Sequence, residues 1–350
     1  MKITSTILSV AVLLGLQVGA SIQASAAKNE PGKTLKTILD RGQLLCPGHN
    51  GSYRGFAEVD DKGNWKGFDI ELCRALGTMI LGSPDKVKII PLGWAQRFPA
   101  LQSGDIDASV KLSEWTMSRD TDLKLQFTRP YFFGGTQFIV HKKAGITKAS
   151  ELAGATICGE SGTSTIRHAS DYLTGLGIKY DLIQFEKQEE AQAAYTSGRC
   201  DAFIGWGPNL AVFKLDAADG AENNIILPDL IKMGPQSIAV RQGDDQFLDV
   251  VNWLLSALLE AEANGITQEN VDAMKAKPKN PTVARLLGVD PGLGDRLGLP
   301  NDWGYKVIKA HGNYGEIFDR NLGAKSPYKL DRGINNLWTK GGVMYSFTLD

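Results

Sequence analysis

The sequence predicts an α/β fold made of two similar lobes joined by two crossover strands. Predicted strands alternate with amphipathic helices through most of the chain, which is typical of parallel βαβ units. Residues 101–108 and 195–202 share one pattern, a helix end with Ser-Gly as C-cap and then a strand opened by Asp-Ala. Chance is the alternative, because helix–glycine–strand joints are common. Apolar residues 136–141 and 236–241 could cross between the lobes.

The first half of the chain carries a regular series of predicted elements. Thr34 and Asp69 are plausible N-caps for two of its helices, because their side-chain oxygens can accept a hydrogen bond from a free backbone N–H group. In chain order, we expect a helix at 34–41, a strand at 43–46, a helix at 69–80, a strand at 86–91, a helix at 96–102 and a strand at 106–110.

The second half repeats this order of elements. Residues 280–350 are rich in Gly, Pro and Asn and are expected to form an ordered extension around the body. Before them we expect a strand at 155–158, a helix after 162–164, a helix ending near 196, and a long helix at 246–263 that returns to the first lobe.

Composition excludes several classes of protein. The 350 residues include 38 Lys+Arg and 39 Asp+Glu, so there is no basic excess to offset the phosphates of a nucleic acid. Neither HExxH nor G-x-S-x-G occurs, and the four histidines show no ligand spacing. Gly32-Lys33-Thr34 lacks the upstream glycine of a P-loop. We therefore expect no metal, no cofactor and no nucleic-acid partner.

Residues 1–26 are predicted to be a secretory signal peptide. Lys2 precedes an apolar run at about 7–18, and Ala24-Ser25-Ala26 provides a small-residue cleavage motif. A membrane anchor is the alternative, but the run is shorter than the roughly 20 residues that cross a bilayer. The mature chain is therefore expected to be exported to a bacterial periplasm. Four cysteines remain in it, and an even number in an exported chain favours disulfides, with three possible pairings.

Residues 111–120 are the strongest candidate for a binding segment. They follow the expected strand at 106–110, and ligands bind at the carboxyl ends of strands in open α/β sheets. Thr116 could cap a short helix that carries Arg119, whose guanidinium can hold a carboxylate through two parallel hydrogen bonds. The alternative is an ion pair of this arginine with Asp120 or Asp122.

A second candidate segment lies between a strand and a helix. Glu160-Ser161-Gly162-Thr163-Ser164-Thr165 would present free N–H groups to an anion at a helix start. A plain N-cap is the alternative interpretation.

At this point the chain resembles a known family, the periplasmic substrate-binding proteins of polar amino-acid ABC importers, and within it the general L-amino-acid-binding subgroup. The resemblance covers nearly all of the expected mature chain. It depends on the motifs GNWKGFDI at 63–70, RFPALQSGDID at 97–107, WTMSRD at 115–120, AVRQGDD at 239–245, GNYGEIFDRNLG at 312–323 and LWTKGG at 337–342.

The resemblance implies a two-lobed type 2 periplasmic-binding-protein fold with a C-terminal extension. Lobe 1 would comprise residues 34–138 plus 240–350, and lobe 2 residues 139–239. The ligand would lie in the cleft, and closure would present the liganded form to a membrane permease. Because each pair would fall within one lobe, we prefer the disulfides Cys46–Cys73 and Cys158–Cys200.

The resemblance also implies roles for single residues. In this family the arginine at the position of Arg119 holds the α-carboxylate of the ligand. Backbone amides of lobe 2 assist it, and an aromatic residue of the first loop covers the ligand. The positions that match these amides and this aromatic residue are Gly162, Thr163, Ser164 and Tyr53.

The chain departs from the family pattern at three positions. Trp206 stands where the family usually has an Asp that accepts the α-ammonium, Glu114 replaces a Ser or Thr, and Leu112 replaces a small polar residue. A buried ammonium without an acceptor costs several kcal/mol. We therefore expect a carboxylate ligand with a cationic or aromatic part, with Glu114 as acceptor and a cation–π contact from Trp206. An internal ion pair between Glu114 and Arg119 is the alternative.

A transport binding protein that acts as a monomer is the leading functional prediction. An enzyme on the same scaffold is the second, because dehydratases acting on cyclohexadienyl acids resemble this fold, and Glu114 would then be a general acid. A sensory protein that presents its liganded state to a receptor is the third.

Overall fold

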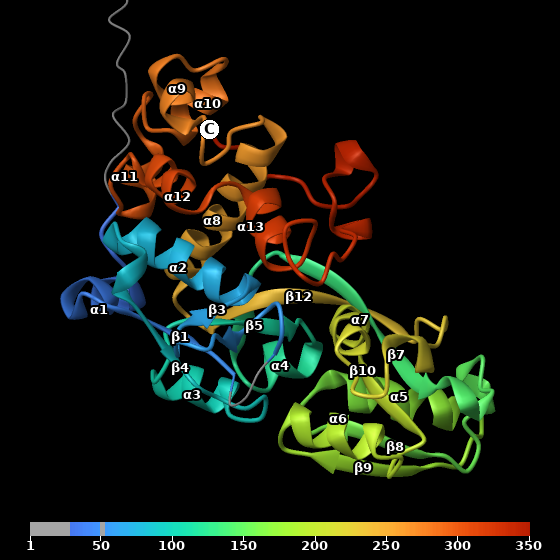
Figure 1. Ribbon diagram of the computed structural model, residues 1–350. Coiled ribbons are helices and arrows are strands. Elements are labelled where there is room, and N and C mark those ends of the chain that lie inside the picture. The colour runs from blue at the N-terminus through green and yellow to red at the C-terminus, as the bar shows by residue number, and fades with distance from the viewer. Residues whose placement is uncertain (1–28, 50–52) are drawn as a thin grey trace, which may run out of the picture.

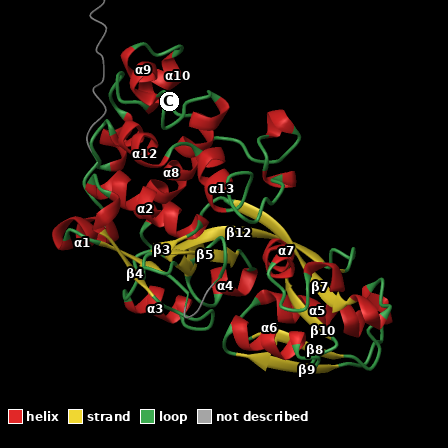
Figure 2. Ribbon diagram, in the orientation of Figure 1, coloured by secondary structure: helices red, strands yellow, loops and turns green. Residues whose placement is uncertain are grey.

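The computed structural model describes residues 29–49 and 53–350, so the predicted signal peptide at 1–26 lies outside the described residues. Two α/β lobes lie next to each other, and the long strands β7 and β12 run from one to the other (Figure 1). The upper lobe in Figure 2 is covered by helices, whereas helices of the lower lobe flank a sheet. The predicted two-lobed fold with two crossover strands is confirmed.

The strands form one large mixed sheet and two small ones. The large sheet has the order β5-β12-β7-β10-β8-β9, with β11 added to β7 and β6 added to β12. The strands are β1 Leu44–Pro47, β2 Glu58–Val59, β3 Trp65–Lys66, β4 Val87–Ile90, β5 Ser109–Glu114, β6 Leu125–Phe127, β7 Phe132–His141, β8 Thr156–Glu160, β9 Asp181–Phe185, β10 Ala202–Trp206, β11 Asn224–Ile226 and β12 Lys232–Arg241.

Helices cover the sheets and build the C-terminal extension. They are α1 Lys33–Arg41, α2 Phe68–Leu81, α3 Arg97–Ser103, α4 Met117–Thr121, α5 Ser164–Gly175, α6 Gln188–Thr196, α7 Gly207–Leu215, α8 Asp245–Ala263, α9 Val271–Ala276, α10 Pro281–Leu286, α11 Leu293–Leu297, α12 Trp303–His311 and α13 Tyr314–Asn321.

The crossover strands pair with each other before they enter different lobes. Lys232 lies opposite Thr136, and Gln236 lies opposite Phe132, in an antiparallel ladder. Strand β7 then pairs with β10, and β12 pairs with β5. Both strands begin about four residues earlier than the sequence predicts, because their ladder starts on the Gly-containing segments that precede the apolar stretches.

Each lobe has its own hydrophobic core. The largest core joins residues from both ends of the chain, with α2 and α8 buried against the extension helices α12 and α13. Two smaller cores in lobe 2 are formed by residues between 138 and 227, on β7, β8, β10 and the helices beside them. The boundaries at 138/139 and 239/240 stay a prediction.

The two disulfides pair the cysteines in the preferred way. Cys46 is bonded to Cys73 with Cα atoms 6.3 Å apart, and Cys158 is bonded to Cys200 with Cα atoms 5.8 Å apart. The first bond joins β1 to α2, and the second joins β8 to the turn before β10. Neither bond crosses between the lobes, so both leave lobe movement free.

Three local predictions are wrong. Gly32, not Thr34, is the N-cap of α1, and the carboxylate of Asp244 accepts the Thr34 N–H at 2.7 Å. Asp69 lies inside α2, whose N-cap is Gly67; the Asp69 carboxylate is buried and accepts a hydrogen bond from Tyr131 at 2.8 Å. At both positions the hydrogen-bond partner is distant in the sequence: the Asp244 carboxylate binds the Thr34 N–H, and the Tyr131 hydroxyl binds Asp69. A local sequence pattern does not reveal such partners.

The third error concerns the strand before the binding segment. Strand β5 spans Ser109–Glu114 rather than 106–110, because Asp107 accepts the Leu45 N–H at 2.8 Å and holds the preceding residues out of the ladder. All six residues of β5 are buried, polar ones included. Much of the predicted binding segment is therefore strand, and its polar side chains are held by the sheet.

The C-terminal extension contacts the start of the crossover. The amide side chain of Asn335 accepts the Phe133 N–H at 2.6 Å and donates to the Phe133 carbonyl at 2.8 Å. The Tyr314 hydroxyl donates to the carbonyl of Tyr131 at 2.7 Å. The extension therefore holds β7 at its first residues, immediately before Gly134 and Gly135.

Candidate functional site

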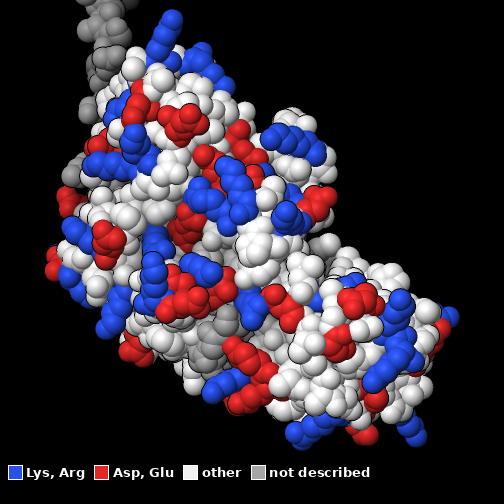
Figure 3. All heavy atoms as spheres, in the orientation of Figure 1, with Lys and Arg blue, Asp and Glu red and all other residues white. Residues whose placement is uncertain are grey.

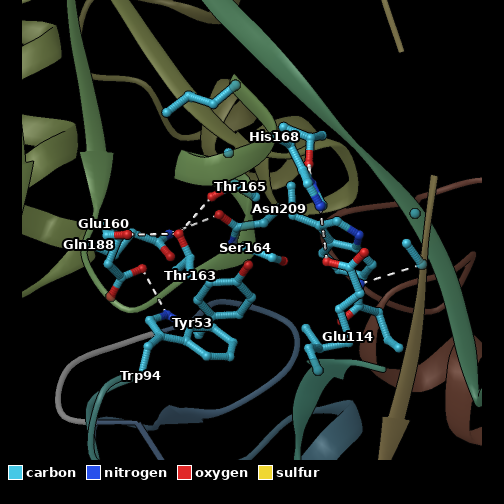
Figure 4. Close-up of a pocket in the computed structure, with 18 of the residues that line it drawn as sticks. Tyr53, Trp94, Glu114, Glu160, Thr163, Ser164, Thr165, His168, Gln188 and Asn209 are labelled. Carbon is cyan, nitrogen blue, oxygen red and sulfur yellow. Dashed lines mark hydrogen bonds and ion pairs between the residues drawn. The ribbon is translucent and has the colours of Figure 1, made fainter. Parts of the chain in front are cut away.

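A cavity lies between the lobes (Figure 4). Both lobes contribute to its wall, since β5 and α4 face the start of α5 and the end of β10. Of the residues predicted to bind ligand, those that line it are Tyr53, Glu114, Arg119, Thr163, Ser164 and Trp206.

Arg119 faces the cavity from α4. Thr116 caps this short helix by accepting the Arg119 N–H at 3.4 Å, as predicted, but it is not part of the cavity wall. One guanidinium nitrogen of Arg119 donates to the backbone carbonyl of Glu114 at 2.8 Å, and the guanidinium carbon lies 5.1 Å from the centre of the Phe98 ring. Burial lowers the pKa of Arg119 to about 10, so it stays charged at neutral pH. Its other donors remain for a ligand.

Glu114 ends strand β5 beside this arginine, and its side chain is buried. Its carboxylate makes no ion pair with Arg119; it lies instead 3.5 Å from the imidazole Nε2 of His168 in lobe 2. The predicted alternative of an internal Glu114–Arg119 pair is therefore not what the structure has. The cation of Arg119 and the anion of Glu114 therefore line one cavity without a direct ion pair between them.

Lobe 2 contributes the start of helix α5. Thr163 is its N-cap, and the Thr163 hydroxyl donates to the Glu160 carbonyl at 2.8 Å. Gly162 does not line the cavity. Its φ is +73°, and a Cβ there would lie 2.8 Å from the backbone N of Ala95, so this glycine permits a close approach of the two lobes.

Two aromatic side chains complete the wall. Tyr53 is buried and its ring meets that of Trp94 edge-on, with centroids 5.4 Å apart. Trp206, at the end of β10, lies in the aromatic core of lobe 1, with its ring 5.3 Å from Phe56 and 5.1 Å from Phe132. Its indole therefore joins the lobes as well as bordering the cavity.

The cavity also has a second group of charged side chains, which local sequence patterns did not predict. Trp94 of lobe 1 donates from Nε1 to the carboxylate of Glu160 in lobe 2 at 2.8 Å, and these side chains face each other in Figure 4. Arg97 donates to the hydroxyl of Ser113 at 3.1 Å and to the carbonyls of Trp94 and Gly162. The bonds from Trp94 to Glu160 and from Arg97 to Gly162 cross between the lobes, so the described structure is a closed form.

Burial shifts the protonation of this group. Desolvation raises the pKa of Glu160 to about 8, opposed by its hydrogen bond from Trp94 and by the charge of Lys111. Desolvation and the nearby Arg97 lower the pKa of Lys111 to about 7. The Lys111 ammonium donates to the carbonyl of Gly48 at 2.9 Å and lies 4.6 Å from the Trp94 ring centre.

Two further lining residues are informative. Leu112 has φ +31°, a region that side chains rarely adopt, and its N–H is held by the Tyr131 hydroxyl at 2.9 Å. His168 was not among the residues predicted to bind ligand. It lies four residues after Ser164, one helical turn into α5, and that spacing was the signal that could have placed it at the cavity.

Three features of the described residues bear on whether the protein has another kind of site: surface charge, metal-ligating side chains and apolar helices. Acidic and basic side chains are interspersed over the face in Figure 3, without a large patch of one sign. Within residues 29–49 and 53–350, no cluster of His, Cys, Asp or Glu has the makings of a metal site. Among the described helices, none has the length and apolar character that crossing a bilayer requires.

The fold and this cavity define a two-lobed protein with a polar cavity between its lobes. The chain belongs to the bacterial extracellular solute-binding proteins, family 3, and the match to this family covers residues 46–271. The general L-amino acid-binding periplasmic protein AapJ of Rhizobium johnstonii is 44% identical over 336 residues, covering 95% of this chain and 98% of that protein. The glutamate/glutamine/aspartate/asparagine-binding protein BztA of Rhodobacter capsulatus is 39% identical over 327 residues, covering 93% and 95%.

Solved structures agree with this family. A periplasmic binding protein of an ABC transporter from Brucella ovis with glutathione bound has a TM-score of 0.86 and 45% identity, covering 90% of this chain and 98% of that one. The ancestral amino acid-binding protein AncCDT-1, a precursor of cyclohexadienyl dehydratase, has a TM-score of 0.58 and 28% identity, covering 70% and 99%. The resemblance to amino-acid-binding proteins of ABC importers is confirmed.

Proposed function

We propose that this protein binds a zwitterionic amino acid, or a small derivative of one, between its lobes and delivers it to the permease of an ABC importer. The observation that carries this proposal is the arrangement of Glu114 and Arg119. The two side chains line one cavity without an ion pair between them. A zwitterion carries a carboxylate that can pair with Arg119 and an ammonium that can pair with Glu114.

The ligand carboxylate is assigned to Arg119. A guanidinium holds a carboxylate through parallel hydrogen bonds, and only one of its donors is used in the described structure. The start of α5, with Thr163 and Ser164, lies across the cavity and offers N–H groups to the same anion. Glu114 accepts the ammonium in place of the absent family Asp, and Tyr53 and Trp206 cover the apolar part of the ligand.

The compartment and the partner follow from the relatives. The relatives AapJ and BztA match nearly the whole chain, and AapJ is named as a periplasmic protein. We assign this chain to the periplasm, with cleavage of the predicted signal peptide near Ala26, and we assign it the monomeric state. Closed lobes are the form that the permease receives.

Isothermal titration calorimetry with matched ligands tests the proposal. We expect L-glutamine or another L-amino acid to bind, and its deaminated and decarboxylated analogues to bind at least about 100-fold more weakly, because each leaves one buried charge without a partner. Equal affinity for the amino acid and both analogues would contradict the proposal.

A larger amino-acid derivative is a second candidate. The Brucella ovis structure holds glutathione, and its chain is 45% identical to this one over 90% of this chain. Glutathione carries an ammonium group and two carboxylates, so it meets the same charge requirement, and it belongs in the titration panel.

An enzyme on this scaffold makes a different prediction. We infer that the protein releases its ligand unchanged, because its similar relatives are named as binding proteins. Following a bound amino acid and a cyclohexadienyl acid by NMR over hours separates the two. Any conversion that depends on Glu114 would favour the enzyme.

A further inference from the structure

His168 faces Glu114 across the cavity. His168 lies on α5 in lobe 2, and Glu114 ends β5 in lobe 1, with Nε2 of the imidazole 3.5 Å from Oε2 of the carboxylate (Figure 4). The other ring nitrogen, Nδ1, lies 2.9 Å from the hydroxyl of Thr136 on the crossover strand β7. All three residues line the cavity, so a ligand would occupy the space beside this pair.

We propose that protonation of His168 decides which ligands the cavity accepts. Neutral His168 leaves the Glu114 carboxylate to a ligand ammonium, whereas protonated His168 takes that carboxylate and excludes the ammonium. This inference rests on the proposed function, since it concerns the same ligand group. It adds a specificity-determining residue to a site in which only Arg119 and Glu114 were assigned charges.

The surroundings of His168 favour the neutral form at neutral pH. Burial is the largest cause of its lowered pKa, and the charges of Arg167 on α5 and Lys232 on β12 lower it further. Glu114 and Asp171 act in the opposite direction. Arg119 is the remaining charged group beside Glu114. The Glu114 carboxylate is thus available to a ligand ammonium at neutral pH. At acid pH, protonated His168 pairs with this carboxylate instead.

The sign of the pH dependence follows. Because the pKa of His168 is lowered, protonated His168 accumulates in the free protein only at a pH below the ordinary histidine pKa of about 6.5. An ammonium ligand must displace that proton, so its Kd rises as the pH falls, by up to about tenfold for each pH unit below the pKa of His168 in the free protein. A 2-hydroxy acid, which lacks the ammonium, does not weaken in this way because protonated His168 neutralises Glu114.

Calorimetry between about pH 5 and about pH 8 tests the proposal. The probe is whichever of L-glutamine, L-asparagine, L-alanine and L-leucine binds most tightly at neutral pH, and its 2-hydroxy acid serves as the matched ligand. We expect the amino acid to weaken at least about tenfold from the neutral to the acid limit in wild type, but less than about twofold in His168→Gln.

His141→Gln is the matched control. His141 also faces a carboxylate, with Nδ1 3.2 Å from Asp219, but it does not line the cavity. Its variant should keep the wild-type pH profile. A wild-type profile in His168→Gln, or equal acid weakening of the hydroxy acid, would overturn the proposal. If no amino acid binds at neutral pH, the proposed function itself fails.

A measurement on wild type guards against a variant that does not fold. Imidazole NMR should show His168 titrating in the free protein and staying neutral over the same range when the amino acid is bound. An imidazole that titrates identically in both states would also overturn the proposal.

Discussion

Two groups of charged side chains border the interlobe cavity, and they differ in how far their hydrogen-bonding capacity is used. Arg97 is fully buried and donates to Ser113 and to two backbone carbonyls, one of them in lobe 2. Arg119 donates to a single carbonyl in its own lobe. Both guanidinium groups lie near the ring of Phe98. A charged group whose donors are used within the protein joins the lobes, whereas one with unused donors is available to a ligand.

The strongest test of this comparison exchanges each arginine for alanine. Arg119→Ala should weaken binding of the carboxylate ligand at least about 100-fold, since an unpartnered buried charge costs about 3–5 kcal/mol. The Tm of its unliganded form should change little. Arg97→Ala should lower that Tm by about 5 °C or more, because it leaves a cavity and unpaired carbonyls. Calorimetry and thermal melts measure both, and the opposite assignment of the two effects would refute the comparison.

A smaller effect is expected from the hydrogen bond that joins Trp94 to Glu160. Trp94→Phe removes the indole donor and keeps most of the ring, so the closed form loses a hydrogen bond worth about 1.5 kcal/mol. We expect about a tenfold weaker Kd, expressed mainly as faster ligand release. Stopped-flow kinetics with Trp303→Phe as control, a tryptophan buried far from the cavity, measures it. An unchanged release rate would show that this bond does not hold the lobes.

The smallest effect concerns the charge of Glu160. Its pKa is raised to about 8 in the closed form, so its contribution to closure is fully present below its ordinary pKa of about 4.3 and is lost as the pH rises through 8. Lys111, with its pKa lowered to about 7, loses its charge in the same range. Glu160→Gln keeps an acceptor for Trp94, so it should bind severalfold more tightly than wild type near pH 8.

The difference in Kd between Glu160→Gln and wild type should also vanish in acid. Titrations toward about pH 4, below the ordinary glutamate pKa of about 4.3, should give the same Kd for both proteins, because the wild-type carboxyl is then protonated in the open and in the closed form. His168→Gln should flatten the acid side of the profile and leave the alkaline side unchanged. A Gln variant that binds more weakly at pH 8 would mean that the ionised carboxylate stabilises closure.

The overall architecture could be predicted from the sequence, but the second group of charged side chains at the cavity could not. The crossover strands, the disulfide pairs and the position of Arg119 could all be inferred, because each depends on a local pattern or on lobe membership. Trp94 and Glu160 lie 66 residues apart in the chain and meet only when the lobes close. No spacing rule connects them.

The wrong predictions have a common physical cause. Asp69 has the residue type and position of a helix cap, but a tyrosine hydroxyl from a distant segment draws its carboxylate into the core. His168 was not predicted to lie at the site because its partner, Glu114, lies on the other lobe. Polar groups satisfied by distant partners are the part of a structure that local pattern describes least well.

The bond pair between Asn335 and Phe133 has a consequence for lobe movement. Both backbone groups of Phe133 are held by one amide of the C-terminal extension, so the first residues of β7 move with lobe 1. Bending during opening is then left to Gly134 and Gly135 and to the paired residues of β12. The tail of the chain, far from the cavity in sequence, thereby fixes the lobe 1 end of this crossover strand.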